Sequence, residues 1–343
     1  MSNRPTINDL ARAAGVSTAT VDRVLNGRAS VRPETARRVY EAAQSIGYHA
    51  AALIGHRVHS DLPRLTIGFV LSKERHSFSQ AFKRAAEQAA IHAPDIRGRA
   101  IVEFSPTQQP ADFARLMEGF AGRVDAVAAV AVNHVEVTTA IERLHAQGIP
   151  CFALCNDFGQ GTRDSYIGLN NMKIGRMAAH MVTTAARTSG KLAMFVGGHR
   201  WHGHELRETG FRSYQREFAP EFTILDTLVN LETRQLTYEA TLDLLSRHPD
   251  LRGIYCAGGG MEGAIAALRE ARQPREVALV VNELTPESRS ALADRYVEMV
   301  IGTPLNMICR NLFTLAHQAR ASEGVPLPGQ TFLRPDIHMP ESI

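Results

Sequence analysis

The sequence predicts an α/β protein, with a body of parallel sheets covered by helices on both faces and a small helical segment before it. Three observations lead to this fold class. The chain has 343 residues, 44% hydrophobic and 21% charged, which is ordinary for a soluble globular protein with room for two or three domains. From Leu65 onward, short apolar runs alternate with amphipathic stretches, as in sheets buried between helices. Three short helical patterns occupy the residues near the start.

The positive charge is concentrated at the start of the chain. Residues 1–60 hold eight Arg and no Lys against four acidic residues, a net charge of +4, whereas the other 283 residues sum to −1. The whole chain has a net charge of only +3, which by itself indicates no polyanionic partner. A basic leading segment on a near-neutral body therefore suggests an appended nucleic-acid-binding module.

Cysteine usage and the absence of apolar segments predict a cytoplasmic protein. The four cysteines do not form a disulfide framework in a chain of this length, and free thiols fit a reducing compartment. The first residues contain no apolar stretch typical of a signal peptide, and no run of 18 apolar residues could cross a membrane. Neither G-x-G-x-x-G nor G-x-x-x-x-G-K-[ST] is present, so we expect no nucleotide cofactor.

The first predicted helix follows Thr6. Asp9 stands three residues later, which is a variant of the capping box. The apolar positions recur at intervals of three and four as far as Ala14, and Gly15 then ends the helix.

Two further helices follow at short intervals. Ser17 caps a helix over residues 18–25, which ends at Asn26 and the glycine after it. Pro33 suits the first position of a third helix, which stops at Gly47.

Two short helices joined by a tight turn, with a third packed on them, make a helix-turn-helix. Its second helix must enter a major groove about 12 Å wide, so its exposed face must be slim and able to form hydrogen bonds. The exposed positions that meet this need are Ser17, Thr18, Ala19, Thr20 and Arg23. A small helical bundle that binds protein is the alternative that the pattern leaves open.

The strings TINDLARAAGVSTATVDRVLNG and VRPETARRVYEAAQSIGY resemble the DNA-binding headpiece of the lactose-repressor (LacI) family of bacterial transcription regulators. The resemblance covers about residues 5–48 almost without gaps. It implies that Thr18, Ala19 and Arg23 read bases. It also implies phosphate contacts from Ser17, Thr20, Asn26 and Arg28.

One residue departs from that family pattern. Asp22 stands where the family usually has Ser. An acidic group near phosphates should weaken non-specific affinity, unless it pairs with Arg23 or accepts from a cytosine amine.

Residues 49–64 form a linker. In the LacI family this stretch folds into a hinge helix on DNA, and a Leu from each subunit is wedged into the minor groove. Leu53 or Ile54 would be that wedge here, although Gly55 weakens a helix at this point. A flexible tether is the alternative.

The body contains eight runs that predict strands and several stretches that predict helices between them. The predicted strands are residues 66–71, 100–104, 126–132, 150–154, 192–196, 253–257, 277–281 and 297–301. The predicted helices include residues 78–91, 135–146, 174–186, 236–246 and 306–319. Ligands of such sheets bind beyond the carboxyl ends of the strands, so the residues that follow each run are the candidate site.

Several polar residues follow these runs, Asn133 among them. Residues 258–260, three glycines, are expected to form a tight turn from strand to helix. The histidines at 199, 202 and 204 lack zinc spacing and a matching set of Cys or carboxylates, so no metal is expected. No G-x-S-x-G elbow is present, and an enzyme is not expected.

The body resembles the periplasmic sugar-binding-protein fold that the LacI family carries as its effector domain. The likeness rests on TIGFVL, GIPCFALCND, YIGLNNMKIGRMAAHM, HGHELRETGFR and NELTPESRSAL, and it spans roughly residues 65–338. It implies two doubly wound parallel-sheet lobes (a periplasmic binding protein type I-like domain), three crossovers and a ligand cleft between the lobes.

The resemblance also implies roles for four residues of the cleft. Arg207 matches an arginine that holds sugar hydroxyls, and Glu283 stands where many members have a cleft Asp. Asp157 follows the fourth strand at a polar contact position, and Phe78 matches an aromatic residue that packs on the ligand. Trp201, the only Trp, either stacks on a sugar or covers the edge of a lobe.

Two departures concern usual hydroxyl partners. Glycines 258–260 replace an Asn-Asp pair, and Gly302-Thr303 replaces a Gln or Asp, so the ligand or its pose should differ from ribose or galactose.

These observations predict three segments: a headpiece at 1–48, a hinge at 49–64 and an effector-binding and dimerisation domain at 65–343. The predicted function is a ligand-controlled transcription regulator, in which a homodimer binds a double-stranded DNA operator and a sugar, polyol or sugar acid binds in the cleft. Arg207 and Glu283 should line one cleft wall, or else form a structural salt bridge. The alternatives are a transport-type sugar-binding protein and an α/β enzyme.

Overall fold

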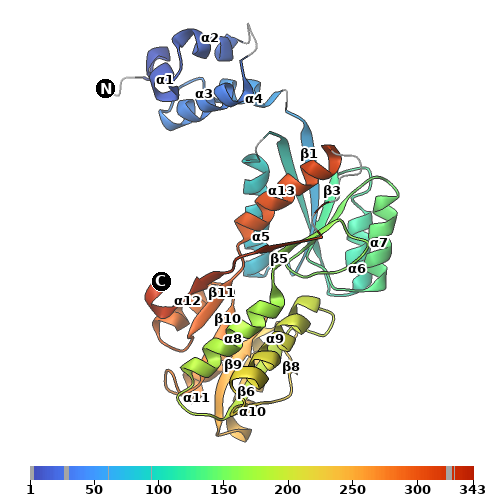
Figure 1. Ribbon diagram of the computed structural model, residues 1–343, viewed down its shortest axis with the longest axis vertical. Helices are drawn as coiled ribbons and strands as arrows, with labels where there is room; N and C mark the ends of the chain where they lie inside the picture. Colours follow the sequence, from blue (N-terminus) through green and yellow to red (C-terminus); the bar gives the residue numbers. More distant parts are fainter. Residues whose placement is uncertain (1–3, 27–30, 61, 94, 322–326, 328) are drawn as a thin grey trace. The chain divides into compact units, whose positions relative to one another are not determined.

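The computed structural model describes residues 4–26, 31–60, 62–93, 95–321, 327 and 329–343. Arg28, expected to contact a phosphate, lies outside the described residues. The chain divides into two compact units. The first is Met1–Leu65 with Ile91–Gly98, and the second is Thr66–Ala90 with Arg99–Ile343. Figure 1 shows the helices of the first unit and the two sheets of the second.

The first unit contains the three predicted helices: α1 (Ile7–Ala14), α2 (Thr18–Asn26) and α3 (Pro33–Ser45). The capping box at α1 is confirmed, because the Thr6 amide donates to an Asp9 carboxylate oxygen at 2.9 Å and the Asp9 amide donates to the Thr6 hydroxyl at 3.3 Å. Gly15 ends α1 in the left-handed conformation, with φ +64°. The Ser17 hydroxyl caps α2 by accepting from the Thr20 amide at 3.2 Å.

The hinge segment forms a fourth helix, α4 (Ala51–Ser60), which continues through Gly55. The glycine is compatible with this helix because α4 packs closely on α3: a Cβ at Gly55 would lie 2.6 Å from Cε2 of Tyr40. Ile54 has no exposed surface and belongs to the core of the helical unit, so the expectation that it could be an exposed wedge is wrong in this conformation. Leu53 is 49% exposed and remains the candidate.

Among the described residues, the second unit holds two sheets, which define two lobes (Figure 1). The first sheet has the order β12-β5-β4-β3-β1-β2, and each strand pairing recorded in it is parallel. Its strands are β1 (Arg64–Ser72), β2 (Arg97–Ser105), β3 (Ala126–Ala129), β4 (Cys151–Leu154), β5 (Ser165–Leu169) and β12 (Gln330–Leu333). Its helices are α5 (Ser77–Ile91), α6 (Pro110–Glu118), α7 (Val135–His145) and α13 (Leu305–Ala321).

The sheet of the second lobe has the order β13-β11-β10-β9-β6-β7, with β8 also paired to β6. Its strands are β6 (Lys191–Val196), β7 (Thr223–Ile224), β8 (Leu228–Val229), β9 (Leu251–Cys256), β10 (Ala278–Asn282), β11 (Met299–Gly302) and β13 (Asp336–His338). The helices of this lobe are α8 (Asn171–Ala185), α9 (His202–Phe218), α10 (Arg234–Arg247), α11 (Met261–Ala271) and α12 (Pro286–Ala293). A short 3-10 turn, Pro340–Ser342, follows β13.

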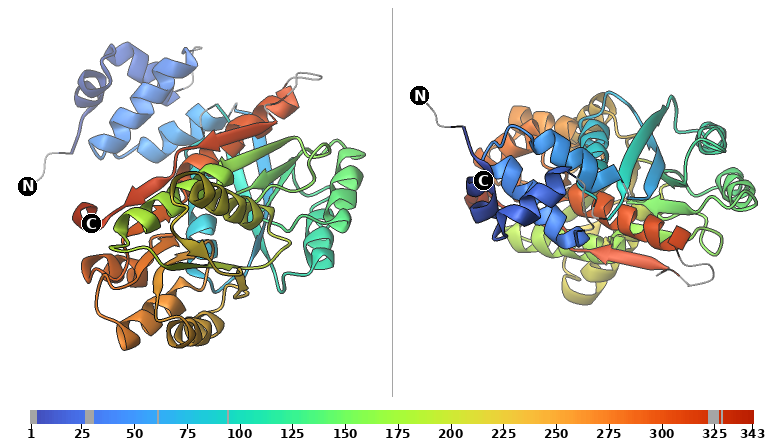
Figure 2. Two further views of the ribbon diagram at one scale, coloured as in Figure 1. Left: turned by 60° about the horizontal axis from the view of Figure 1, so that its bottom comes forward. Right: turned by 90° about the horizontal axis from the view of Figure 1, so that it is seen from above.

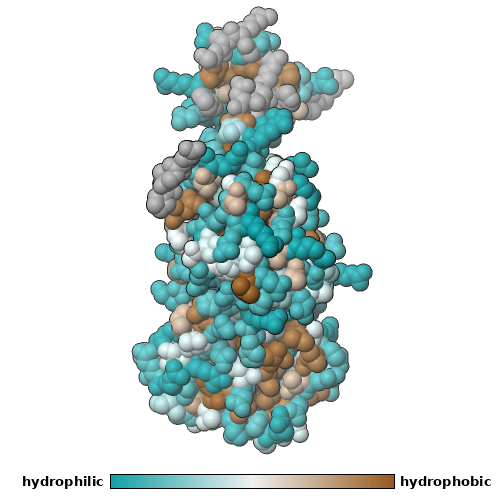
Figure 3. All heavy atoms as spheres, turned by 90° about the vertical axis from the view of Figure 1, so that its right-hand side faces the viewer, coloured by the Kyte–Doolittle hydropathy of each residue, from teal (hydrophilic) through white to brown (hydrophobic). Residues whose placement is uncertain are grey.

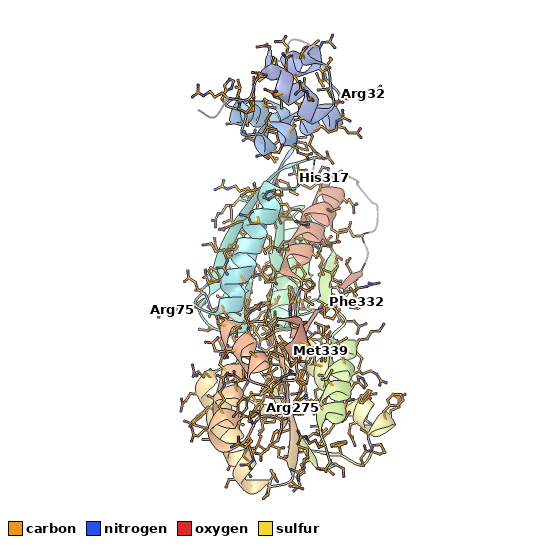
Figure 4. All side chains as sticks on the ribbon, turned by 90° about the vertical axis from the view of Figure 1, so that its left-hand side faces the viewer. Arg32, Arg75, Arg275, His317, Phe332 and Met339 are labelled. Carbon is orange, nitrogen blue, oxygen red and sulfur yellow. The ribbon has the colours of Figure 1, made fainter. Side chains whose placement is uncertain are left out.

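The chain passes between the lobes three times, as the resemblance implied. It crosses from β5 into α8, returns from β11 into α13, and crosses again from β12 to β13. Figure 2 shows the same connections from two further directions. In Figure 4, Phe332 on β12 and Met339 just after β13 mark the two sides of the last crossover.

The side chains of β6 alternate between two hydrophobic core clusters, one on each face of the second sheet. Leu192 and Met194 pack in one core cluster with residues of α8 and α9. Ala193 and Phe195 pack in the other, with residues of α10, α11 and α12. Successive side chains of a strand point to opposite faces, so a wholly apolar strand needs a helical layer on each side.

The eight predicted strands are present, with ends that differ by a few residues. The sequence analysis did not predict β5, β7, β8, β12 or β13. Of these, β7 and β8 have two residues each, and β12 and β13 are partly exposed, so none of these four carries a long apolar run. β5 is fully buried but has only five residues.

Within the part of the chain that is described, no helix is long and apolar enough to span a bilayer. The face drawn in Figure 3 is mainly hydrophilic, with hydrophobic groups gathered toward the second lobe. Large exposed hydrophobic residues of that lobe include Phe218, Val229 and Leu236.

Candidate ligand-binding cavity and recognition helix

A cavity of about 110 Å³ lies between the two lobes, at the carboxyl ends of their strands. Residues from both lobes line it, among them Phe78 from the first lobe and Trp201, Arg207 and Glu283 from the second. These are the four predicted effector residues that the fold brings together.

Arg207 lies buried on α9 and is held by two hydrogen bonds. Its Nε donates to the Asn171 side-chain oxygen at 2.8 Å, and its Nη1 donates to the carbonyl of Ala257 at 2.5 Å. Asn171 is the first residue of α8, so the guanidinium is fixed against the first crossover. Among the described residues, Nη2 has no hydrogen-bond partner, which leaves donors available to the cavity.

Glu283 follows β10 in a left-handed conformation, with φ +69°. Its carboxylate accepts from the Thr303 hydroxyl at 2.5 Å and from the Thr303 amide at 3.2 Å. Burial raises the pKa of Glu283, and the Thr303 hydrogen bonds and the Arg207 charge oppose that rise. Within the described residues no ion pair joins Arg207 to Glu283, so the salt-bridge alternative is not what this structure shows. Thr303, expected to be a missing hydroxyl partner, instead lines the cavity.

Trp201 lies between the cavity and the first lobe, and its stacking on a sugar stays a prediction. It lines the cavity, and its ring also contacts Phe113 of the first lobe edge-on, with centroids 6.4 Å apart. On the other side it lies 6.2 Å from the ring of His204.

His204 lines the cavity and is partly buried, and its Nδ1 accepts from the Gly197 amide at 3.1 Å. Burial lowers its pKa to about 4, although the neighbouring Glu232 carboxylate opposes that shift. The imidazole is therefore neutral at physiological pH. No group of three or more His, Cys, Asp or Glu able to hold a metal ion occurs in the described ranges.

Two predicted residues lie away from the cavity lining. Asp157 is buried in an ion pair with Arg163, whose Nε and Nη2 lie 2.5 and 2.8 Å from the two carboxylate oxygens. Gln160 and Gln330 donate to the same carboxylate. Its acceptor sites are thus used within the first lobe, and it is not available to an effector.

Asn133 is exposed, and its side chain accepts from the Gly159 amide at 3.3 Å. Its backbone amide donates to the carbonyl of Arg200 in the second lobe at 3.1 Å. After the fourth strand, the cavity is lined instead by Cys155 and by Asn156. The side-chain oxygen of Asn156 accepts from the Gly203 amide of the second lobe at 2.7 Å.

The three glycines form the expected turn between β9 and α11. Gly260 is left-handed, with φ +89°. A Cβ at Gly258 would lie 2.6 Å from Cε1 of His204, and one at Gly259 would lie 3.0 Å from Cβ of Glu232. Small residues are therefore required here because His204 and Glu232 occupy the adjacent space.

Glu232 is the main cavity residue that the sequence analysis missed. It follows β8, a strand of two residues that no pattern predicted, and it is itself left-handed, with φ +54°. Lys73 and Asn282 also line the cavity, and both stand among the residues that follow predicted strands.

The recognition helix α2 presents Thr18, Ala19 and Arg23 to solvent, while Val21 and Val24 are buried against the other helices. Ser17 and Thr20 share a hydrogen bond of 2.9 Å between their hydroxyls. Asp22 pairs with Asn26, whose amide donates to it at 2.6 Å, rather than with Arg23.

The cavity and the helix can thus perform different tasks. The cavity combines donors on Arg207, acceptors on Glu283 and two aromatic rings, which suits a small molecule with several hydroxyl groups. The exposed face of α2 is short-chained and polar with one guanidinium, which suits the edges of bases in a major groove.

Comparisons with known proteins match each unit. Residues 6–50 match the family model for bacterial regulatory proteins of the lacI family, and residues 67–323 match a periplasmic binding protein domain. The chain is 28% identical over 295 residues to the HTH-type transcriptional regulator GntR of Pseudomonas aeruginosa, covering 81% of this chain and 79% of that protein. It is 26% identical over 288 residues to MalR of Streptomyces coelicolor, covering 79% and 78%.

Solved structures show the fold of the second unit. A periplasmic solute-binding protein from Actinobacillus succinogenes with bound D-allose has a TM-score of 0.73 at 19% identity, covering 81% of this chain and 98% of that one. A solute-binding protein from Bacillus halodurans with bound myo-inositol has a TM-score of 0.71 at 17% identity, covering 82% and 96%.

A helix-turn-helix joined to a two-lobed binding domain defines a DNA-binding transcription regulator with a domain for a small ligand. Residues 6–50 form a DNA-binding domain of the lacI family of bacterial regulatory proteins, and over residues 67–323 the chain belongs to the periplasmic binding protein domain family. The alternative of a transport protein is not favoured, because the curated relatives described above are HTH-type transcriptional regulators and residues 6–50 match the lacI family model.

Proposed function

We propose that the chain is a repressor whose operator affinity is controlled by a small sugar-like effector bound between the lobes. The observation that carries the proposal is the cavity lined by Arg207, Glu283, Phe78 and Trp201. A guanidinium only donates hydrogen bonds, an ionised carboxylate only accepts them, and each hydroxyl does both. Sugars, polyols and sugar acids carry such hydroxyls on an apolar frame, which an aromatic ring can cover.

The size of the cavity favours a small effector. Its volume of about 110 Å³ is below the ~300–1,000 Å³ typical of sites for drug-sized ligands. A single sugar ring or a short polyol suits this volume better than an oligosaccharide.

The proposal includes a homodimer on a near-palindromic DNA operator. Two-fold symmetry of the protein requires matching symmetry in the two half-sites. Thr18, Ala19 and Arg23 would read base edges, and Ser17, Thr20 and Asn26 would contact phosphates. The exposed Leu53 on α4 is the proposed wedge in the minor groove.

A thermal-shift screen of hexoses, hexitols and hexonic acids tests the effector site. A ligand present at 100 times its Kd should stabilise the protein by ~2.7 kcal/mol, which gives a clear rise in Tm. Arg207→Ala should remove that rise because the donors of the cavity are lost.

Arg212→Ala is the matched control. Arg212 lies on the same helix, but it bonds Glu208 and Thr227 rather than lining the cavity. The control should keep the ligand-induced rise in Tm. If no compound on the panel stabilises the wild type, or if Arg207→Ala responds as the wild type does, the proposed effector site is wrong.

A further inference from the structure

We propose that Lys73, Gln108 and Glu232 form a clasp that holds the two lobes together and sets the affinity of the effector by favouring closure of the lobes. The inference rests on the proposed function only where effector affinity is concerned. The clasp itself is a contact between lobes that can be tested without a ligand.

The second lobe presents Glu232 on a preorganised loop after β8. Leu231 and Glu232 are both left-handed, with φ +50° and +54°. The buried Asn230 fixes this loop, because its side-chain oxygen accepts from the Glu232 amide at 2.9 Å and its side-chain nitrogen donates to Thr237 at 2.9 Å. The left-handed region is unfavourable for non-glycine residues, and such strain concentrates where function requires it.

The first lobe reaches this loop from two elements. Lys73, which follows β1, donates from Nζ to the Leu231 carbonyl at 2.8 Å and to a Glu232 carboxylate oxygen at 3.2 Å. Gln108, between β2 and α6, donates to the same carboxylate oxygen at 3.2 Å. Figure 4 labels Arg75, which follows Lys73 by two residues at this end of the first lobe.

The surroundings favour a charged Glu232 carboxylate. Burial raises its pKa, the Lys73 ammonium and the hydrogen bonds from Lys73 and Gly259 oppose that rise, and the net shift lowers the pKa. The Gly259 amide also points at the carboxylate, at 3.4 Å. The side chains of Lys73 and Glu232 are 29% and 18% exposed, so solvent screens this pair less than a surface pair.

The polar groups of the clasp form hydrogen bonds with other groups of the protein. Lys73 is bonded to two acceptors and the carboxylate of Glu232 to three donors, whereas Arg207 keeps donors for the cavity. Opening the lobes would separate Lys73 and Gln108 from Glu232. The clasp therefore favours the closed arrangement, and the effector gains affinity from a closure that is already favourable.

Trp201 provides a built-in reporter of closure. It is the only Trp of the chain, it is 6% exposed, and it contacts Phe113 across the lobes. In the full-length protein without any added ligand, Lys73→Met and Glu232→Gln should each increase quenching of Trp201 fluorescence by acrylamide. The double variant should add little to either single change, because the two residues form one contact.

Glu208→Gln is the matched control. Glu208 pairs with Arg212 inside the second lobe, and these side chains are 26% and 30% exposed, close to the values for the clasp. This control should leave quenching unchanged. Lys73→Arg keeps the charge and should stay close to the wild type, so a change seen only in Lys73→Met is not caused by misfolding.

Calorimetric titration with the compound that gives the largest thermal shift then measures the effect on binding. Both single clasp variants should lose about tenfold or more in affinity, as expected for hydrogen bonds to charged groups. The loss should be equal for a hexose and the corresponding hexitol, because the clasp acts through closure of the lobes and not through a hydroxyl of the ligand.

The outcomes separate the two proposals. Increased quenching in the clasp variants supports the clasp even if no sugar binds, in which case only the effector proposal fails. Unchanged quenching overturns the clasp. A loss of affinity that differs between the hexose and the hexitol, with additive single variants, would assign Glu232 to direct ligand contact and also overturn it.

Discussion

Arg23 projects from α2 between Val21 and Val24, whose side chains are buried in the helical unit. The guanidinium is the only charged group among the three proposed base-reading residues. Its planar pair of donors matches the O6 and N7 acceptors of guanine, a contact worth ~1–3 kcal/mol.

Arg23→Ala should therefore flatten the base preference at one symmetric position in each half-site. Selection of binding sites from a random duplex library measures the consensus for both proteins. An identical consensus for the wild type and the variant would remove Arg23 from base recognition.

His204 predicts how stability depends on pH. Burial lowers its pKa to about 4 in the folded protein, from about 6.5 when unfolded. Between these values the unfolded chain binds more protons, so stability should fall as the pH falls from about 6.5 toward 4, by roughly 3 kcal/mol in all. Above pH 6.5 the group is neutral in both states and contributes no pH dependence.

His204→Asn removes the titrating group and keeps an acceptor for the Gly197 amide. Urea unfolding across this pH range should show a shallower acid loss for the variant than for the wild type. Parallel curves for the two proteins would mean that His204 is not buried as described.

The sequence predicted which residues line the cavity where a side chain follows a long apolar strand or matches a family string, as for Arg207 and Glu283. The prediction failed at Asp157, because the chain bends after β4 with Cys155 in a left-handed conformation, φ +59°, and the sequence does not indicate which of the following residues then faces the cavity. Asn156 faces the cavity instead. Glu232 was missed because nothing in the sequence near β8 indicates a strand or a left-handed turn.

At the scale of secondary-structure elements, the close packing of α8 against α9 determines where Arg207 lies. A Cβ on Gly175 of α8 would collide with the backbone carbonyl of Arg207, and one on Gly210 of α9 would collide with that of Met172. The two glycines thus allow the helix backbones to touch, and one of these contacts lies at Arg207, the proposed effector-binding residue.

Gly175→Ala should destabilise the protein by about 1–3 kcal/mol, as overpacking of a well-packed core does. It should also weaken the ligand-induced rise in Tm, because α9 must shift together with Arg207. Thr184→Ala, on the exposed face of α8, should remain within about 0.5 kcal/mol of the wild type. Equal stability of the two variants in chemical denaturation would contradict the close helix contact.

Helix ends could be predicted because their signals are local. Thr6 with Asp9, Ser17 and Pro33 each mark a helix start through their own side chain or ring. The helix through Gly55 could not be predicted from local signals, because it is stabilised by packing against another helix. The missing Cβ of Gly55 makes room for the side chain of Tyr40 on α3.

At the scale of the whole molecule, a regulator needs both a site for DNA and a site for a ligand, with an energetic coupling between them. The sequence indicated the two sites by separate patterns, a basic helical segment and a strand-helix alternation. The coupling itself has no local signal, because it depends on how effector binding changes the balance between states of the molecule.

The central claim is tested most directly by operator affinity with and without the effector. The operator is taken from the site selection, and the ligand is the compound that stabilises the protein most. Fluorescence anisotropy of labelled operator duplex then gives the Kd in both conditions.

The account predicts that saturating ligand changes the operator Kd of the wild type by about 5–150-fold, the usual range of allosteric coupling. Arg207→Ala should bind the operator as the wild type does without ligand and should not respond to it. An operator Kd that stays the same for the wild type with and without a ligand known to bind would contradict the account.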